Sequence, residues 1–283
     1  MTYKSNYRIT LLITLLALFG DLSGQIVNFH HIKWTREKIA RGLIWKSAHT
    51  VLNDSIPQNI NVLIVNTNKR SIALSYNPKK KEVVSRQAAG VGALAAVNAG
   101  FFSIRDGYSA AYIKTGGLIV DTDTAKKWTR NPSLTGSVLI DKNGHLFIDH
   151  KKMNNWYDNH PEYQDVLVTG PLLIARKVKT QLPATSLVKL KHPRTSIGKK
   201  GTHKIVLVTL DGRAKESRGM TLAELADLML SLHCRDAVNL DGGGSTTMWI
   251  SGKPFNGIVN MPSDNKKFDH EGERAVSDIL LVK

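Results

Sequence analysis

Residues 236–250, DAVNLDGGGSTTMWI, constrain the fold more than any other stretch of the chain. An apolar run ends there on Asp241, and three glycines then lead through three hydroxyl residues into a second apolar run. The pattern predicts a buried strand, a polar loop and another strand. Glycine loses more conformational freedom on folding than other residues, so three in a row indicate more than turn geometry. We therefore expect a binding loop whose backbone N–H groups face an anion such as phosphate.

Two other interpretations of this loop can be weighed from the sequence. A tight turn between two strands is the simplest alternative, because glycine is common in turns. A P-loop is excluded, since no Lys follows the glycines and no helical pattern comes next.

The N-terminus has the pattern of a secretory signal peptide. Residues 1–8 are basic, residues 9–19 form an apolar run, and small and polar residues follow up to Gly24. The run is short for a membrane span, and an uncleaved anchor is the alternative. We expect a secreted or periplasmic protein that loses residues 1–24 and has no stable membrane insertion afterwards.

Length and charge limit the domain count and the partners. The chain has 283 residues, 42% of them hydrophobic, and no Pro- or Gly-rich linker divides it, which favours a single domain. Its formal net charge of +16 indicates either an anionic partner or simply a solvated basic surface. The lysines are spread along the chain and no nucleic-acid-binding motif is present, so nucleic acid is not expected. The single cysteine, Cys234, excludes an intrachain disulfide.

Apolar patterning predicts a mixed α/β class, with a mixed sheet core and flanking helices. Early strands are expected at residues 26–34 and 41–52, and residues 61–67 and 71–76 are expected to form a hairpin. A short helix is expected at residues 83–92, and residues 154–164 are expected to form an exposed loop.

A strand–helix–strand pattern precedes the glycine loop. Residues 204–210 form the clearest buried strand and end on Asp211, and an amphipathic helix is expected at residues 221–233. If the flanking strands are parallel neighbours, Asp211 and Asp241 leave the sheet at the same edge, where ligands usually bind. Glu224 has capping-box spacing from Thr221, and this role is favoured over a catalytic one.

Two further candidates lie at strand ends. Asn98 follows an apolar strand and precedes a glycine and two phenylalanines, a pattern that also fits a turn with core aromatics. Arg194, in the segment HPRTSIG, is either a surface ion-pair partner or an anion clamp, since a planar bidentate donor suits phosphate.

Taken together, these segments resemble the phosphodiester glycosidase family. The resemblance is carried by VNAGFF, TGPLLI, HPRTSIG, LDGR with GMTLAELADLM, and NLDGGGSTTMW. It spans residues 91–283, and residues 25–90 are expected to be a strand-rich segment of the same domain. The chain has alanine in VNAGFF where the family commonly has a second glycine, and it lacks the cysteine-rich and membrane-spanning extensions of the animal member.

The resemblance implies a mixed α/β domain that hydrolyses sugar-1-phosphodiesters, with bacterial relatives linked to exopolysaccharide. It places ten residues at or beside the site: Asn98, Arg194, Asp211, Arg213, Asp241, Gly242, Gly243, Gly244, Ser245 and Thr246.

The chemistry of such a substrate suggests roles for these residues. The departing phosphomonoester is already a stable anion, so the site needs a cationic cradle and a carboxylate more than a strong acid. Asp241 is preferred to Asp211 as the catalytic carboxylate, and Arg194 and Arg213 fit the cradle. The alternative for both aspartates is a structural one, in which their hydrogen bonds hold the loops together. No cofactor is expected, although a divalent cation held by the two aspartates is an alternative without ligand spacing to support it. A non-catalytic glycan- or polyanion-binding module is the competing hypothesis.

Overall fold

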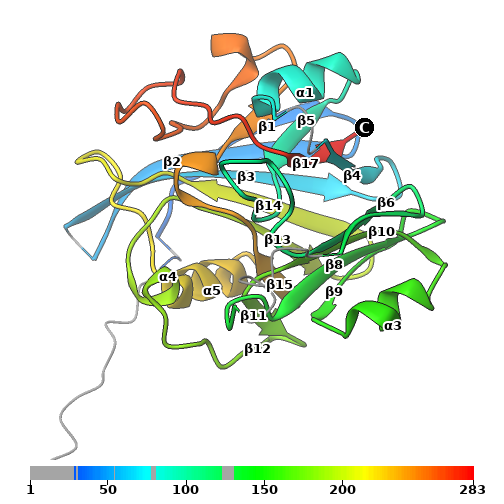
Figure 1. Ribbon diagram of the computed structural model, residues 1–283. Coiled ribbons are helices and arrows are strands. Elements are labelled where there is room, and N and C mark those ends of the chain that lie inside the picture. Colours follow the sequence, from blue (N-terminus) through cyan, green and yellow to red (C-terminus); the bar gives the residue numbers. More distant parts are fainter. Residues whose placement is uncertain (1–28, 30, 54, 78–80, 123–130) are drawn as a thin grey trace, which may run out of the picture.

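The strands of the computed structural model form three sheets, and helices lie outside them (Figure 1). The structure describes residues 29, 31–53, 55–77, 81–122 and 131–283. The signal peptide expected at residues 1–24 lies outside these ranges.

The largest sheet has eight strands, and neighbouring strands in it pair antiparallel. In spatial order these are β1 (Thr35–Ala40), β2 (Leu43–Leu52), β3 (Ile56–Asn66), β14 (Lys204–Leu210), β13 (Arg194–Lys200), β15 (Asp236–Asn239), β11 (Leu172–Ala175) and β12 (Val178–Lys179).

Two smaller antiparallel sheets pack against it. The five-stranded sheet has the order β7 (Leu118–Thr122), β6 (Tyr112–Thr115), β10 (Tyr163–Thr169), β8 (Gly136–Asp141) and β9 (Leu146–His150). The four-stranded sheet has the order β16 (Met248–Ile250), β5 (Ala95–Asn98), β17 (Asp278–Val282) and β4 (Ile72–Tyr76). The helices are α1 (Val84–Gly90), α3 (Asn154–Asp158), α4 (Ser186–Lys189) and α5 (Leu222–Ser231), with 3₁₀ turns η1 (Gly243–Ser245) and η2 (Phe255–Gly257).

One hydrophobic core joins the three sheets. Leu207 of β14, Ile113 of β6 and Val97 of β5 belong to the same buried cluster, so each sheet contributes to it. The alternate residues of β14, among them Val206 and Val208, pack on the other face of the sheet against α5. Burial on both faces explains why β14 is a continuous apolar run. The predicted mixed class and single domain are confirmed, although strands outweigh helices.

Helix α5 forms where its periodicity predicts. The Thr221 hydroxyl accepts a hydrogen bond from the Glu224 N–H at 3.2 Å, and the Glu224 carboxylate accepts one from the Thr221 N–H at 2.7 Å. This capping box confirms the structural role expected for Glu224. With 10 residues, α5 is the longest helix in the ranges described, and none of the helices there is long and apolar enough to cross a membrane.

Three local predictions are wrong. β3 and β4 do not form a hairpin, because β3 pairs with β2 and β14 while β4 pairs with β17 in another sheet. Residues 154–164 are not a loop, since they contain α3 and the start of β10, and Tyr157 is fully buried. The first strand begins at Thr35, after the residues expected to form it, of which 26–28 and 30 are not described.

β14 and β15 are also not neighbours. β13 lies between them and is antiparallel to both, so β14 and β15 run in the same direction without pairing. Their carboxyl ends therefore reach the same edge of the sheet, beside the first residue of β13.

Candidate functional site

The site begins at the edge where β14 and β15 end. Arg194 of β13 is in register with Leu210 of β14, and Ser196 with Asn239 of β15. Asp211 directly follows β14, and Asp241 comes two residues after the end of β15, so the register brings both aspartates and Arg194 to one edge of the sheet.

The glycine loop lies at this edge, and two of its positions have no room for a side chain. Gly243 has a φ of 62°, and a Cβ on it would lie 2.9 Å from Nη2 of Arg213. A Cβ on Gly244 would collide with the guanidinium of Arg274 and the carboxylate of Asp264. The loop thus allows two arginines to approach the main chain of η1 closely.

Asp241 is held at the base of this loop and is partly exposed. Its N–H donates to the Ala99 carbonyl at 2.8 Å, and its Oδ1 accepts from the Gly242 N–H at 2.9 Å. Burial raises the pKa of Asp241 to about 6, against the lowering effect of Ser245, the Gly242 N–H and two arginines. The carboxylate is therefore ionised near neutral pH and next to positive charge.

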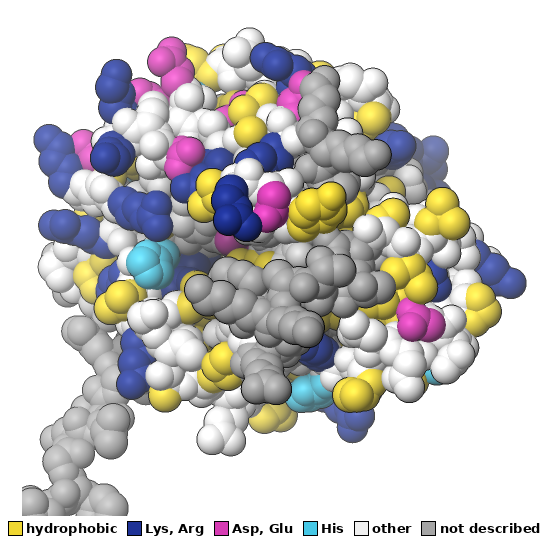
Figure 2. Space-filling model, viewed as in Figure 1, with side chains coloured by type: hydrophobic (Ala, Val, Ile, Leu, Met, Phe, Trp, Pro, Cys, Tyr) yellow, Lys and Arg dark blue, Asp and Glu magenta, His cyan; other side chains and the backbone are white. Residues whose placement is uncertain are grey.

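A cationic hollow adjoins the loop, with a volume of about 330 Å³. The residues that line it are Gly212, Arg213, Ala214, Ser263, Asp264, Lys266, Lys267 and Arg274. Figure 2 shows Lys and Arg side chains gathered on the side of the molecule where Figure 1 draws the loops after β14 and before β17. Four cations against one carboxylate make this hollow suited to a phosphate group.

Asp264 orders one of these cations. Its Oδ1 accepts a hydrogen bond from Nε of Arg274 at 3.0 Å and another from Nη2. Nη1 of Arg274 lies 3.5 Å from the Ser245 hydroxyl. Arg274 therefore spans the distance between the hollow and the glycine loop.

Asp278, the first residue of β17, is a second carboxylate beside Asp241 that sequence reasoning missed. It is 1% exposed, and its Oδ1 accepts a hydrogen bond from the Gly100 N–H, while its Oδ2 has no hydrogen-bond partner in the described part of the chain. Burial, together with the charge of Asp241, raises the pKa of Asp278 to about 7, against the lowering effect of the Gly100 N–H. Two carboxyl groups with raised pKa values thus lie next to each other, a pattern common in active sites.

Asp211 is buried, and all of its described contacts are structural hydrogen bonds. Its Oδ2 accepts from Nδ2 of Asn59 at 2.6 Å and from the Met261 N–H at 3.0 Å, and its Oδ1 accepts from Nδ2 of Asn260 at 2.9 Å. The side chain is fully buried, and burial raises its pKa to about 7. Asp211 ties β3 to the segment that leads into the cationic hollow, and it offers no exposed oxygen to a substrate.

Asn98 also acts beneath the loop. It is 1% exposed and bonds to the Asp241 carbonyl, the Thr195 hydroxyl and the Thr247 N–H. Ser245 and Thr246 are buried as well, and the Thr246 hydroxyl has no hydrogen-bond partner within the described ranges. Asn98 therefore supports the loop from within the protein, whereas the Ser245 hydroxyl is directed toward Asp241 and Arg274.

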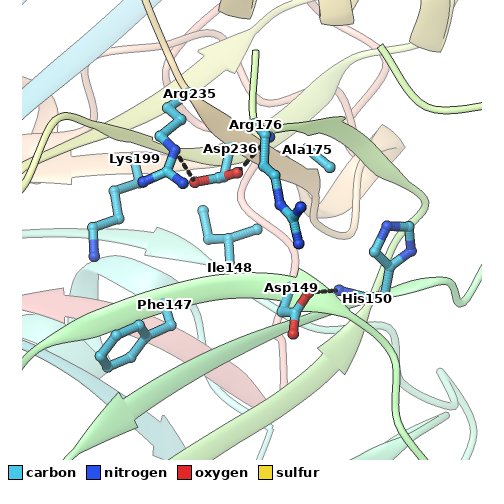
Figure 3. Close-up of a pocket in the computed structure, with 9 residues that line it drawn as sticks. All are labelled: Phe147, Ile148, Asp149, His150, Ala175, Arg176, Lys199, Arg235 and Asp236. Atoms are coloured by element: carbon cyan, nitrogen blue, oxygen red, sulfur yellow. Dashed lines mark hydrogen bonds and ion pairs between the residues drawn. The ribbon is translucent and has the colours of Figure 1, made fainter. Parts of the chain in front are cut away.

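A larger cavity, of about 580 Å³, lies at the opposite end of the eight-stranded sheet (Figure 3). None of the site residues expected from the sequence lines it.

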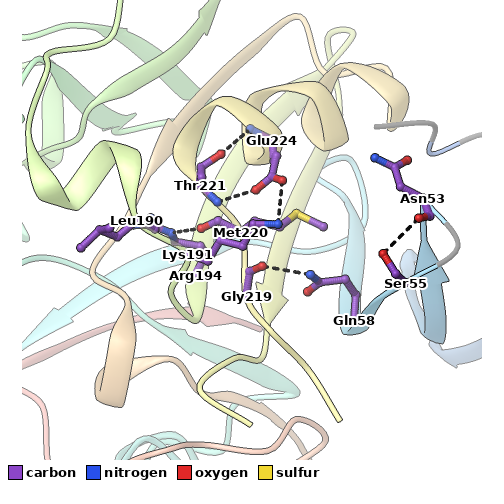
Figure 4. A network of polar contacts seen from close by, with 10 residues as sticks. All are labelled: Asn53, Ser55, Gln58, Leu190, Lys191, Arg194, Gly219, Met220, Thr221 and Glu224. Atoms are coloured by element: carbon purple, nitrogen blue, oxygen red, sulfur yellow. Dashed lines mark hydrogen bonds and ion pairs between the residues drawn. The ribbon is translucent and has the colours of Figure 1, made fainter. Parts of the chain in front are cut away.

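Arg194 is brought to the edge but points into the protein (Figure 4). Its Nε donates to the Met220 carbonyl at 2.8 Å, and its Nη2 donates to the carbonyls of Leu187 and Leu190 at 2.8 and 2.7 Å. The side chain is 1% exposed, and burial lowers its pKa to about 10. The guanidinium fixes the end of α4 to the turn before α5, so the geometry does not support the expected anion clamp.

Of the ten residues expected at the site, only Arg213 lines the cationic hollow together with the newly found Arg274, Lys266 and Lys267. The polar composition of residues 263–273 was the available signal for the lysines, but polar loops are common and nothing in the sequence placed this one beside Asp241.

Comparison with known proteins agrees with this arrangement. A family model described as phosphodiester glycosidase matches residues 91–283, which include Asp241, Asp278 and the cationic hollow. The chain belongs to the phosphodiester glycosidase family. A phosphodiester glycosidase is a hydrolase. The matched region contains β5 to β17, which include strands of all three sheets, and leaves out β1 to β4.

Similar sequences include two proteins much longer than the matched region. An uncharacterized protein, YomE, derived from the SPbeta prophage of Bacillus subtilis is 29% identical over 227 residues, which is 76% of this chain and 30% of YomE. The bovine N-acetylglucosamine-1-phosphodiester alpha-N-acetylglucosaminidase is 25% identical over 213 residues, 66% of this chain and 36% of that enzyme. The chain thus corresponds to about a third of each relative's length.

A solved structure has a similar fold. The catalytic domain of the zebrafish N-acetylglucosamine-1-phosphodiester alpha-N-acetylglucosaminidase, described as auto-inhibited by its pro-peptide, superposes with a TM-score of 0.67 at 18% identity. The match covers 88% of this chain and 87% of the zebrafish chain. The shared fold therefore extends beyond residues 91–283 into the N-terminal strands of the eight-stranded sheet.

Proposed function

We propose that this protein hydrolyses sugar-1-phosphodiesters, breaking the bond between the anomeric carbon and the phosphate oxygen. The observation that carries the proposal is the adjacency of Asp241, a partly exposed residue, and a hollow lined by Arg213, Arg274, Lys266 and Lys267. Such a pairing of negative and positive groups suits a substrate whose sugar develops positive charge while its phosphate departs as an anion.

The cationic hollow binds the phosphate in this proposal. Arg213 and Arg274 stabilise the phosphomonoester as it leaves, and their fixed positions beside the glycine loop avoid reorganisation during the reaction. Lys266 and Lys267 add positive charge at the wall of the hollow. Because the leaving group is a stable anion, no strong proton donor is required.

Asp241 acts at the sugar in this proposal. As a carboxylate it either attacks the anomeric carbon or removes a proton from the attacking water, and water supplies the hydroxyl group of the released sugar. Asp278 is buried beside Asp241 and accepts a hydrogen bond from the Gly100 N–H, so its role in this proposal is to position Gly100. Asp211 and Asn98 hold the loops around the site.

A non-catalytic module that binds polyanions is the second candidate, because the cationic hollow alone would bind phosphate. The same experiment separates the two. Purified protein is incubated with a panel of sugar-1-phosphodiesters, and free sugar and phosphomonoester are measured. Asp241→Asn should abolish product formation while Asp227→Asn, which changes an ion-paired aspartate on α5, should not. Salt-sensitive binding without product, or full activity in Asp241→Asn, would contradict hydrolysis by this site.

We also propose that the protein is exported and acts on phosphate-linked glycans of the envelope or of an exopolysaccharide. The N-terminal basic and apolar segments support export. Fractionation of cells that express the full chain, with N-terminal sequencing of the exported form, tests this proposal. Retention of the full-length chain in the cytosol would contradict it.

A further inference from the structure

The larger cavity and Asp241 lie at opposite ends of the paired strands β13 and β15. Lys199 lines the cavity, five residues beyond Arg194 on β13, which corresponds to roughly 16 Å at the rise of an extended chain. We name this cavity the β9–β13 cleft. Its lining consists of Phe147, Ile148, Asp149, His150, Ala175, Arg176, Lys199, Arg235 and Asp236.

The β9–β13 cleft separates the edges of two sheets. One wall is β9, the edge strand of the five-stranded sheet, which contributes Phe147 and Asp149. The facing wall comes from the eight-stranded sheet, with Arg176 after β11 and Asp236 at the start of β15 (Figure 3). Residues from separate parts of the chain therefore converge on a space of about 580 Å³, large enough for a saccharide of more than one unit.

Positive charge in the cleft exceeds negative charge. Figure 3 shows the Arg176 side chain extending across the hollow, and its guanidinium has no hydrogen-bond or ion-pair partner in the part of the chain that the structure describes. Both carboxylates already have partners. Asp149 lies 3.1 Å from Nζ of Lys152, and Asp236 accepts from the Arg176 N–H at 2.8 Å and lies 3.8 Å from Nε of Arg235. An anion that enters the cleft would therefore meet the guanidinium of Arg176, which no carboxylate of the described residues neutralises.

Lys199 and Phe147 form a mixed charged and apolar surface. Nζ of Lys199 lies 4.7 Å from the centroid of the Phe147 ring and donates to the Leu146 carbonyl at 2.7 Å. Phe147 is 38% exposed, although its two neighbours on β9, Leu146 and Ile148, are buried. An exposed ring beside fixed cations suits a sugar ring that bears an acidic substituent, because the apolar face of the sugar can pack on the aromatic ring.

We propose that the β9–β13 cleft binds an anionic saccharide unit, one that carries phosphate or carboxylate, at a position separate from the proposed reaction site. A polymer held there remains close to Asp241 between cleavage events, which raises the local substrate concentration without adding contacts at the site of hydrolysis. The binding itself does not depend on the proposed hydrolysis, so the two can fail independently.

The test compares two double variants that each remove two exposed positive charges. Arg176→Ala/Arg235→Ala changes the cleft, and Lys38→Ala/Arg41→Ala changes β1 and the turn that follows it. Both are made in an Asp241→Asn background, which prevents turnover of the ligand. Binding is measured by calorimetry with a phosphodiester-linked hexasaccharide, an oligogalacturonate hexamer and neutral maltohexaose, and circular dichroism checks folding.

The cleft variant should bind at least one acidic hexamer about 10-fold more weakly than the control variant, a difference of about 1.4 kcal/mol. Loss confined to the phosphate ligand or to oligogalacturonate identifies which acid the cleft prefers. Phe147→Ala should weaken binding of the same hexamer and leave binding of inorganic phosphate unchanged. Equal affinities for the cleft and control variants with both acidic ligands would overturn the proposal, as would equal loss for maltohexaose. If the double variant does not fold, Arg176→Gln alone supplies the comparison.

Discussion

The side-chain amide of Asn98 donates a hydrogen bond to the main-chain carbonyl of Asp241, 2.6 Å away. The Oδ1 atom of the same side chain accepts from the Thr195 hydroxyl at 2.7 Å and from the Thr247 N–H at 3.1 Å. One buried amide therefore joins β5, β13 and the residues on both sides of the glycine loop.

We expect Asn98→Ala to lower both stability and turnover. The substitution leaves buried donors and acceptors without partners, which costs about 1–3 kcal/mol per group. The Asp241 loop loses its support while the cationic hollow is unchanged, so kcat should fall more than KM rises. Chemical denaturation and steady-state kinetics measure the two effects. Asn68→Ala, at an exposed turn, serves as the control, and an unaltered kcat in Asn98→Ala would argue against this positioning role.

Replacement of Arg274 should slow the reaction, because the departing phosphate loses a stabilising positive charge. In the proposed mechanism its guanidinium is fixed by Asp264 and stabilises the departing anion, so Arg274→Ala should reduce kcat/KM by roughly 10²- to 10³-fold. Lys215→Ala, which removes an exposed cation outside the hollow, should have little effect. Equal rates for the two variants on a sugar-1-phosphodiester would exclude Arg274 from the chemistry.

The position of Asp241 could be predicted because the local sequence determines it. An apolar run that ends on a carboxylate before three glycines specifies a strand exit and a loop that needs small residues, and both are present. The capping box of α5 depends on two residues three positions apart and was predicted for the same reason. Local spacing was sufficient in both cases.

The remaining features depend on contacts between distant segments. Asp278 and Asp241 are brought together by pairing of β17 with β5, which no local pattern reveals. The position of Arg194 in its strand was predicted correctly, but the direction of its side chain was not. The carbonyl groups that bind its guanidinium come from α4 and the segment before α5, which are distant from the strand pattern. Side-chain direction at a strand end is decided by such tertiary partners and not by the strand itself.

The proposed role of Asp241 predicts an acidic limit to activity. Burial raises the pKa of Asp241 to about 6, and the carboxylate form is the active one in the proposal. The kcat/KM should therefore be constant above about pH 7 and fall about 10-fold for each pH unit below 6. Rates measured from pH 4 to pH 8 on a substrate that does not ionise in this range test the prediction. A limit near pH 4, where an exposed aspartate titrates, would show that another group controls the rate.

The buried carboxyl group of Asp278 should make stability depend on pH. Its pKa is raised to about 7 in the folded protein, above the value of 3.8 for a free aspartate, so between these values the folded state binds a proton that the unfolded state has lost. The contribution of the protonated Asp278 to the free energy of unfolding is present in full below pH 3.8 and is lost as the pH rises through 7. Asp278→Asn cannot ionise and removes this dependence.

The free energy of unfolding of wild type relative to Asp278→Asn should therefore decrease by about 2–3 kcal/mol between pH 5 and pH 8. Asp211 and Asp241, whose pKa values are also raised, remain in both proteins and cancel in the comparison to a first approximation. Urea denaturation at the two pH values supplies the measurement. Ser277→Ala alters the neighbouring residue without changing an ionisable group, so it should shift stability equally at both. A constant difference between wild type and Asp278→Asn would mean that Asp278 is ionised throughout this range and that another cation or water compensates its burial.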